Sequence, residues 1–225
     1  LTAATEPPPR LATDQRGGHI GISGADVYLG EEASEARLRD DARRYSVVHI
    51  AAHGALDAPD PRRSGLVLTA AGDDDGFLSV GEVLDLDLDA DLVVLSACDT
   101  ARGAVGSGEG GQSVARAFLY GGARSVIATL WQVDDRETEA VMRSFYKTLN
   151  GSQLSPEAAL RQARLELRRA PPTSEGFVGE GRGEKVPGAP EHKRAPGRSG
   201  ADLVGHPFFW APFIAIAGSA PNSQH

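Results

Sequence analysis

The sequence predicts an α/β fold in which a mostly parallel sheet carries helices on both of its faces. Two short apolar runs, residues 47–52 (VVHIAA) and 91–97 (DLVVLSA), have the length and composition of buried parallel strands. Helical patterns alternate with such runs along the chain, which is typical of parallel sheets. Because ligands of these sheets bind at the carboxyl ends of the strands, the residues just past each run are the first candidates for a site.

The N-terminal segment, residues 1–18, is rich in Pro, Thr and Gly and shows no periodicity. We therefore expect this segment to be a linker or lead-in from a longer chain. The domain is expected over residues 19–220, with ordered structure beginning near Val27. The segment has no basic leader and no apolar h-region, so it does not read as a signal peptide.

Helix start and stop residues and apolar periodicity place the other elements. A helix N-terminus is indicated by Ser155, Pro156 and Glu157. The pair Gly121 and Gly122 is expected to end the helix over 112–120. In chain order we expect a helix over 31–45, a strand over 47–52, a hairpin over 65–79, a helical turn over 80–84, a strand over 91–97, a helix over 112–120, a strand over 124–131, helices over 135–149 and 155–170, and a final strand within 206–218. Residues 173–205 are Gly-rich with few apolar groups, and we expect this insertion to be disordered.

Composition excludes several functions. The net charge of -8 argues against nucleic acid, which would require a basic surface, and no apolar run approaches the roughly 20 residues of a membrane-spanning helix. We therefore expect no nucleic-acid or membrane partner. The single cysteine allows no internal disulfide and no Cys-based metal cluster, which suits the reducing cytoplasm.

Two reactive residues directly follow the two apolar runs. His53 ends the first and Cys98 ends the second, 45 residues later, and a thiol needs a neighbouring base or cation to become a thiolate near neutral pH. Caspases have a comparable spacing of about 50 residues. The alternative is a buried structural Cys98 and a hydrogen-bonded loop residue at His53, which is the commoner situation for an isolated pair.

An acyl-enzyme mechanism also needs donors for a developing oxyanion. The backbone N–H groups of Gly54 and Cys98 can supply them, and the absence of a side chain at Gly54 lets a substrate carbonyl approach the backbone closely.

Four motifs in fixed order carry a family resemblance: HIAAHG (49–54), DLVVLSACDTARG (91–103), GGARSVIATLWQVDDRET (121–138) and HPFFWAPFIAIAG (206–218). Together they resemble the CHAT domain, which is grouped with the caspase and separase peptidases. The resemblance implies a caspase-like three-layer α/β/α sandwich, with His53 as general base and Cys98 as nucleophile. By the same resemblance His49 is structural.

The resemblance also implies a specificity pocket. LWQVDD (130–135) is similar to the separase pattern in which the final Asp faces the basic residue before the cut, and Asp135 is the matching position. A carboxylate there can pair with an Arg side chain. Asp134 or Asp135 can equally act as a helix N-cap. Asp99 and Trp131 are further candidates for the pocket, although aromatic residues such as Trp131 more often pack in the core.

Two other readings compete with a peptidase. Residues 106–111 match the glycine pattern of dinucleotide-binding loops, but eight residues separate Ala97 from the first glycine, whereas in that fold the glycine follows the strand at once. The second reading is a catalytically silent CHAT-like interaction module. The presence of both His53 and Cys98 favours an enzyme.

We therefore predict a cysteine endopeptidase that cleaves a specific protein partner through a thioester, with no metal or organic cofactor. Relatives act in bacterial defence and programmed cell death, and CHAT domains are often joined to helical repeats, so the resemblance implies such an upstream domain or an activating partner. Basic residues within 173–205 offer sites for self-cleavage if the enzyme prefers Lys or Arg.

Overall fold

The fold was obtained as a computed structural model. It describes residues 10–14, 25–57, 59–96, 100, 113–131, 133, 135–169 and 207–218, with only the backbone described at 10–14, 135–137 and 209. The predicted insertion at 173–205, the glycine pattern at 106–111 and residues 97–99 lie outside these ranges.

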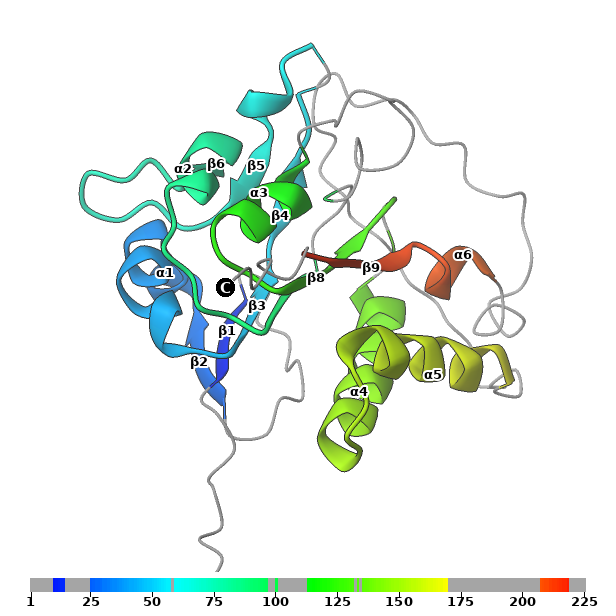
Figure 1. Cartoon of the computed structure of the whole chain (residues 1–225). Coiled ribbons are helices and arrows are strands. Elements are labelled where there is room, and N and C mark those ends of the chain that lie inside the picture. The colour runs from blue at the N-terminus through cyan, green and yellow to red at the C-terminus, as the bar shows by residue number, and fades with distance from the viewer. Residues whose placement is uncertain are drawn as a thin grey trace, which may run out of the picture.

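A six-stranded sheet forms the centre of the molecule (Figure 1). Its strand order is β2-β1-β3-β7-β8-β9, and every neighbouring pair is parallel except β8 with β9. This arrangement confirms the predicted mostly parallel sheet. The strands are β1 (Arg10–Asp14), β2 (Ala25–Leu29), β3 (Val47–Ala51), β7 (Leu92–Leu95), β8 (Ser125–Thr129) and β9 (Phe213–Ala217).

Helices cover both faces of the sheet, as the alternation of elements predicts. Side chains of α1, α2 and α3 share one core with the sheet, and side chains of α4 and α5 share the other. Among the helices that the structure describes, not one is long and apolar enough to cross a membrane. The helices are α1 (Glu35–Asp41), α2 (Val80–Leu84), α3 (Val114–Tyr120), α4 (Asp135–Gly151), α5 (Pro156–Arg169) and α6 (Pro207–Trp210), with short 3-10 turns at Gly30–Glu32, Ala42–Arg44 and Pro61–Arg63.

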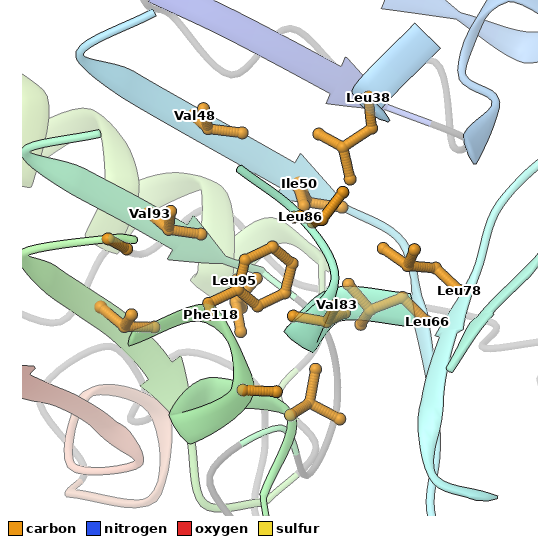
Figure 2. Packing of buried hydrophobic residues seen from close by; sticks show 14 of the residues in the cluster. Leu38, Val48, Ile50, Leu66, Leu78, Val83, Leu86, Val93, Leu95 and Phe118 are labelled. Carbon is orange, nitrogen blue, oxygen red and sulfur yellow. The ribbon is translucent and has the colours of Figure 1, made fainter. Parts of the chain in front are cut away.

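Alternating side chains of the central strands divide between the two cores. In β7, Val93 and Leu95 point to the face covered by α3, whereas Leu92 and Val94 point to the face covered by α4 and α5. Figure 2 shows Leu95 beside Phe118 of α3 in the first core. Because both faces are buried, these strands read as continuous apolar runs in the sequence.

A second, three-stranded sheet branches from the carboxyl end of β3. It consists of β4 (His53–Ala55), β5 (Gly65–Val67) and β6 (Phe77–Ser79), all antiparallel. The predicted hairpin over 65–79 corresponds to β5 and β6, and β4 adds a third strand. Gly65 is required here, because a Cβ at this position would lie 2.4 Å from the carbonyl oxygen of Leu78.

The structure differs from the sequence prediction at the N-terminus. Residues 1–18 were expected to form a linker, but Arg10–Asp14 form β1, which pairs with β2 on one side and β3 on the other. The linker assignment is therefore wrong for these five residues. The segment RLATD has no continuous apolar run, which is the usual sequence signal of a buried strand. It also directly follows three prolines, which are typical of a loop.

Helix boundaries also differ slightly. The helix expected over 31–45 is divided into Gly30–Glu32, α1 and Ala42–Arg44, and Ser34 caps α1 by accepting a hydrogen bond from the backbone N–H of Arg37. Gly121 and Gly122 end α3 as predicted. At Gly122 φ is 108°, and a Cβ would lie 2.1 Å from the carbonyl oxygen of Leu88, so only glycine fits without rearrangement.

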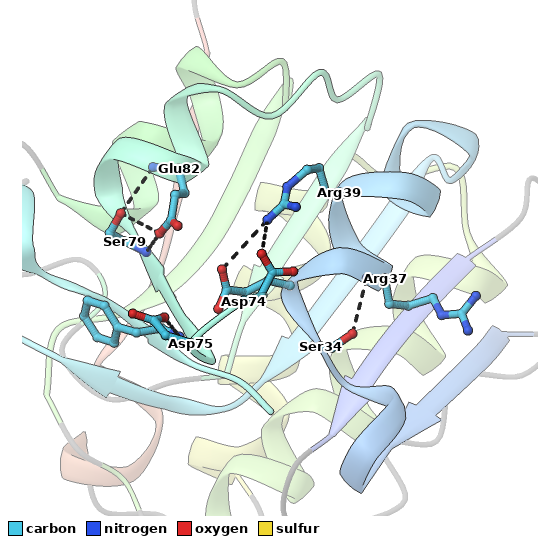
Figure 3. A network of polar contacts seen from close by, with 9 residues as sticks. Ser34, Arg37, Arg39, Asp74, Asp75, Ser79 and Glu82 are labelled. Carbon is cyan, nitrogen blue, oxygen red and sulfur yellow. Dashed lines mark hydrogen bonds and ion pairs between the residues drawn. The ribbon is translucent and has the colours of Figure 1, made fainter. Parts of the chain in front are cut away.

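The small sheet is braced against α1 by polar contacts around a buried carboxyl group, Glu35. Figure 3 shows Arg39 of α1 reaching Asp74 in the β5–β6 connection, at 3.1 Å. The Thr69 backbone N–H donates to the carbonyl oxygen of Ala33 at 3.0 Å. Glu35 is 1% exposed, and burial together with the negative charges of Glu82, Asp74 and Asp75 raises its pKa above the ordinary value.

We expect Glu35→Gln to stabilise the fold at neutral and alkaline pH. The raised pKa means that the folded state disfavours the ionised carboxyl, so Glu35 costs stability above its folded pKa and this cost disappears as the pH falls through that pKa. Glutamine removes the charge and keeps a carbonyl acceptor. Thermal unfolding at pH 8 and pH 4.5 checks this: the gain should be larger at pH 8. Exposed Glu31→Gln is the control, and an equal gain at both pH values would contradict the explanation.

Candidate functional site

His53 lies at the carboxyl end of the central sheet. Strand β3 ends at Ala51, the buried Ala52 follows, and the chain then enters β4, whose first residue is His53. The residue is exposed and pairs with Val67 of β5. The main sheet therefore brings the imidazole to its edge, and the small sheet sets the direction in which the chain leaves.

The described residues on either side of Cys98, Ser96 and Thr100, are held by hydrogen bonds, and Cys98 itself lies outside the described residues. Before it, the backbone N–H of Ser96 donates to the carbonyl oxygen of Ile50 at 2.9 Å, which extends the β3–β7 ladder by one residue. After it, Thr100 is buried: its Oγ1 accepts from the Thr129 N–H at 3.3 Å, and its carbonyl oxygen accepts from the Ala115 N–H at 3.2 Å.

The hydrogen bond between Ser96 and Ile50 joins the carboxyl ends of β3 and β7, the two strands that His53 and Cys98 follow in the sequence. His53 is three residues beyond Ile50, and Cys98 is two residues beyond Ser96. An extended chain spans at most about 3.6 Å per residue, so the Cα atom of His53 lies within roughly 11 Å of that of Ile50. The described residues Ile50 and Ser96, which precede His53 and Cys98 in the chain, thus lie at the ends of adjacent strands at the same edge of the sheet.

His49, the other histidine of HIAAHG, lies inside the protein. Its side chain is fully buried, and Nδ1 is 2.8 Å from the hydroxyl group of Tyr146 on α4. Burial lowers the pKa of His49 to about 3, so the ring is neutral at physiological pH. This environment differs from that of the exposed His53, and His49 has no access to a substrate.

Of the predicted pocket residues, Trp131 is the one whose side chain is described. It is half-buried just beyond β8, its Nε1–H donates to the carbonyl oxygen of Phe208 at 3.0 Å, and the two rings are 6.0 Å apart. Asp135 is the first residue of α4, and its side chain is not described. Asp99 and Asp134 lie outside the described residues.

The glycine expected to supply an oxyanion donor, Gly54, follows His53 in β4. It is half-buried and stands opposite Leu66 in the register of β4 and β5. Its backbone is therefore held in the small sheet next to the exposed imidazole.

The sequence did not single out the residues that anchor the Cys98 segment. Ser96 and Thr100 are small polar residues close to Cys98, and nothing in the sequence distinguishes them from other small polar residues. Tyr146 occupies one of several apolar positions along an amphipathic helix. The role of the Tyr146 hydroxyl group is evident only from the structure, where it pairs with His49, a residue 97 positions earlier in the chain.

The sequence prediction for this edge of the sheet is nucleophilic acyl transfer. The exposed His53 follows β3, and Ser96, which directly follows the adjacent strand β7, is followed by Ala97 and Cys98 in the sequence; a thiol and an imidazole are the groups that such chemistry uses. Within the described part of the chain, there is no group of three or more His, Cys, Asp or Glu side chains that could hold a metal ion.

Comparison with known sequences places the chain in a family. Residues 9–219 match the CHAT domain. Among curated proteins, tetratricopeptide repeat protein 28 of Mus musculus is 38% identical over 88 residues, and its Homo sapiens counterpart is 37% identical over 88 residues. Each alignment covers 39% of this chain, and only 4% of the mouse protein and 3% of the human protein.

Solved structures of similar fold include a separase and a gingipain. The separase of the Saccharomyces cerevisiae separase–securin complex matches 70% of this chain and 11% of its own, with a TM-score of 0.50 and 13% identity. The Arg-specific cysteine proteinase gingipain R matches 72% of this chain and 43% of its own, with a TM-score of 0.48 and 10% identity. The mixed α/β architecture is caspase-like. Because the family match spans nearly the whole chain, this protein belongs to the CHAT domain family.

Proposed function

We propose that this chain is a cysteine endopeptidase in which Cys98 is the nucleophile and His53 is the general base. The observation that carries the proposal is the 2.9 Å hydrogen bond between Ser96 and Ile50, because it joins the two strand ends from which Cys98 and His53 emerge. Membership of the CHAT family supports the assignment of these two residues.

In the proposed mechanism, His53 accepts the proton of the Cys98 thiol, and the thiolate attacks the scissile carbonyl carbon. The N–H groups of Gly54 and Cys98 donate to the resulting oxyanion. Collapse of this intermediate breaks the C–N bond, the imidazolium gives its proton to the leaving amine, and a thioester remains on Cys98. Water, deprotonated by His53, then hydrolyses the thioester and restores the thiol.

Labelling with peptide chloromethyl ketones tests the nucleophile. Because the chain has a single cysteine, a mass increase that maps to a thiol identifies Cys98 without ambiguity. We expect labelling of the full chain and no labelling of Cys98→Ala. If no probe labels Cys98 and no peptide library is cleaved, the chain is instead a catalytically silent interaction module of the same fold.

Asp135 is the proposed specificity residue, since it begins α4 four residues after Trp131. Asp134, Asp99 and Trp131 are the other residues proposed to line the pocket. A carboxylate can hold an arginine side chain by two parallel hydrogen bonds, whereas a neutral replacement cannot.

We expect Asp135→Ala to reduce labelling by an arginine-ended probe by roughly 10- to 100-fold, because a charged hydrogen-bonded contact contributes about 1.5–3 kcal/mol. Labelling by a probe ending in norleucine should change little. The control is Glu139→Ala, on the same helix one turn later, where the exposed carboxylate pairs with Arg143. Retention of the arginine preference in Asp135→Ala would assign the pocket to another residue.

The proposed biological setting is the cleavage of one protein partner, in bacterial defence or programmed cell death. The matched relatives are named for tetratricopeptide repeats, which supports an attached helical-repeat domain as the element that selects the partner.

A further inference from the structure

The structure leaves two buried polar atoms unpaired near the sheet edge from which Cys98 and His53 emerge. They are Nε2 of His49 and Oγ of Ser96, and neither has a hydrogen-bond partner among the described residues. His49 is 0% exposed and Ser96 is 8% exposed. Buried polar atoms are normally paired with protein or with an ordered water, so a pair of them close together points to a shared partner.

The strand register places both side chains on the same face of the sheet. His49 stands opposite Val94 in the adjacent β7, and Ser96 is two residues beyond Val94, so it points to the same side. This is the face covered by α4 and α5. Two residues of strand advance about 6.6 Å and neighbouring strands lie about 4.8 Å apart, so the two Cα atoms are separated by roughly 8 Å. One water between the side chains can span that separation.

The hydrogen-bonding capacity of the two groups matches water. A neutral imidazole has one donor and one acceptor nitrogen, and Nδ1 already pairs with Tyr146. Nε2 is therefore a donor if Nδ1 accepts, and an acceptor if Nδ1 donates. Water and a serine hydroxyl each donate and accept, so a bridging water satisfies Nε2 and Ser96 Oγ in either tautomer.

We propose that an ordered water bridges His49 Nε2 and Ser96 Oγ, and that the chain Tyr146–His49–water–Ser96 positions the Cys98 segment. Ser96 precedes Cys98 by two residues, and its backbone is already bonded to Ile50. The bridge fixes its side chain as well, so the last residue before the thiol-bearing segment is held from two directions. The inference rests on the proposed role of Cys98, and it makes His49 and Ser96 positioning residues.

The sign of the stability change in Ser96→Ala tests the bridge directly. If the hydroxyl holds a bridging water, its removal leaves Nε2 of His49 without that hydrogen-bond partner. Tm should then fall by roughly 2–4 °C, the size expected for one lost hydrogen bond in a chain of this length. If the hydroxyl is unpaired, its removal relieves a desolvation cost, and Tm stays the same or rises. That second result would overturn the proposal.

A matched control uses the same substitution at another buried serine. Ser125 lies on β8, and its Oγ donates to Glu157 at 2.9 Å. Ser125→Ala should also lower Tm, because a known hydrogen bond is lost, but it should leave the reactivity of Cys98 unchanged.

Alkylation of Cys98 by iodoacetamide across pH provides the readout for positioning. We expect Ser96→Ala and His49→Leu each to slow alkylation at pH 7 by ~5–10-fold and to move the apparent pKa of the thiol toward 8.5, the value for a free cysteine. The double variant should be no slower than His49→Leu alone, since both changes remove the same bridge. His49→Gln, which keeps an amide able to pair on both sides, should restore part of the rate.

Strictly additive effects, or unchanged alkylation in both single variants, would overturn the positioning role. His53→Ala separates this failure from a failure of the proposed dyad. If His53→Ala leaves the pH profile of Cys98 unchanged, the dyad is wrong, while the sign of the Tm change in Ser96→Ala still decides whether the water bridge exists.

Discussion

Replacing His53 with alanine is expected to lower kcat/KM for peptide hydrolysis by ~10²–10⁴-fold, the range attributable to general acid–base catalysis. The substrate is a fluorogenic peptide that carries the sequence of the chloromethyl ketone that labels Cys98 fastest. His53 is exposed at the start of β4, so its removal should leave Tm nearly unchanged.

The control for this prediction is His19→Ala, the same substitution at a histidine to which no role is assigned. Full activity in His53→Ala would remove His53 from the mechanism. A loss of activity accompanied by a large fall in Tm would point to a structural effect, and the iodoacetamide profile of Cys98 would then distinguish the two.

Phe118→Ala is expected to destabilise the protein by about 3–5 kcal/mol. Phe118 is 0% exposed on α3, and it packs in the core that joins α2 and α3 to β7 (Figure 2). Removing a buried aromatic ring loses its transfer free energy and leaves a cavity that the close-packed surroundings fill only partly.

Urea-induced unfolding measures this loss, with Tyr120→Ala as the matched control. Tyr120 lies two residues later on the same helix and is 77% exposed, so its truncation removes an aromatic ring at little cost. Similar losses in the two variants would mean that α3 contributes through helix propensity and not through the core.

The central strands could be predicted from the sequence because burial on both faces leaves a local signature. Residues 47–51 and 92–95 are apolar at nearly every position, and the two cores receive alternate side chains from them. Strand β1 lacks that signature, and its place between β2 and β3 depends on pairing with residues that follow it in the chain. Such pairing leaves no periodicity in a segment as short as RLATD.

The two strand ends of the candidate site could also be predicted, because His53 and Cys98 each directly follow a recognisable apolar run. The hydrogen bonds that hold the neighbouring residues could not be predicted. Thr100 is held by Thr129 and Ala115, and His49 by Tyr146, through contacts between residues that are 15 to 97 positions apart. The sequence shows that a hydroxyl or imidazole group is present, but it does not show which distant residue will be its hydrogen-bond partner.

The fold class, the family and the two strand ends that precede His53 and Cys98 could be assigned without the structure. These features depend on local apolar patterns and on motifs of a few residues. Three further features became visible in the packed molecule: Arg10–Asp14 lies within the sheet, the carboxyl ends of β3 and β7 are joined at Ile50 and Ser96, and His49 is buried beside Tyr146. Burial and hydrogen-bond partners depend on how distant segments pack together, and a local pattern does not encode that packing.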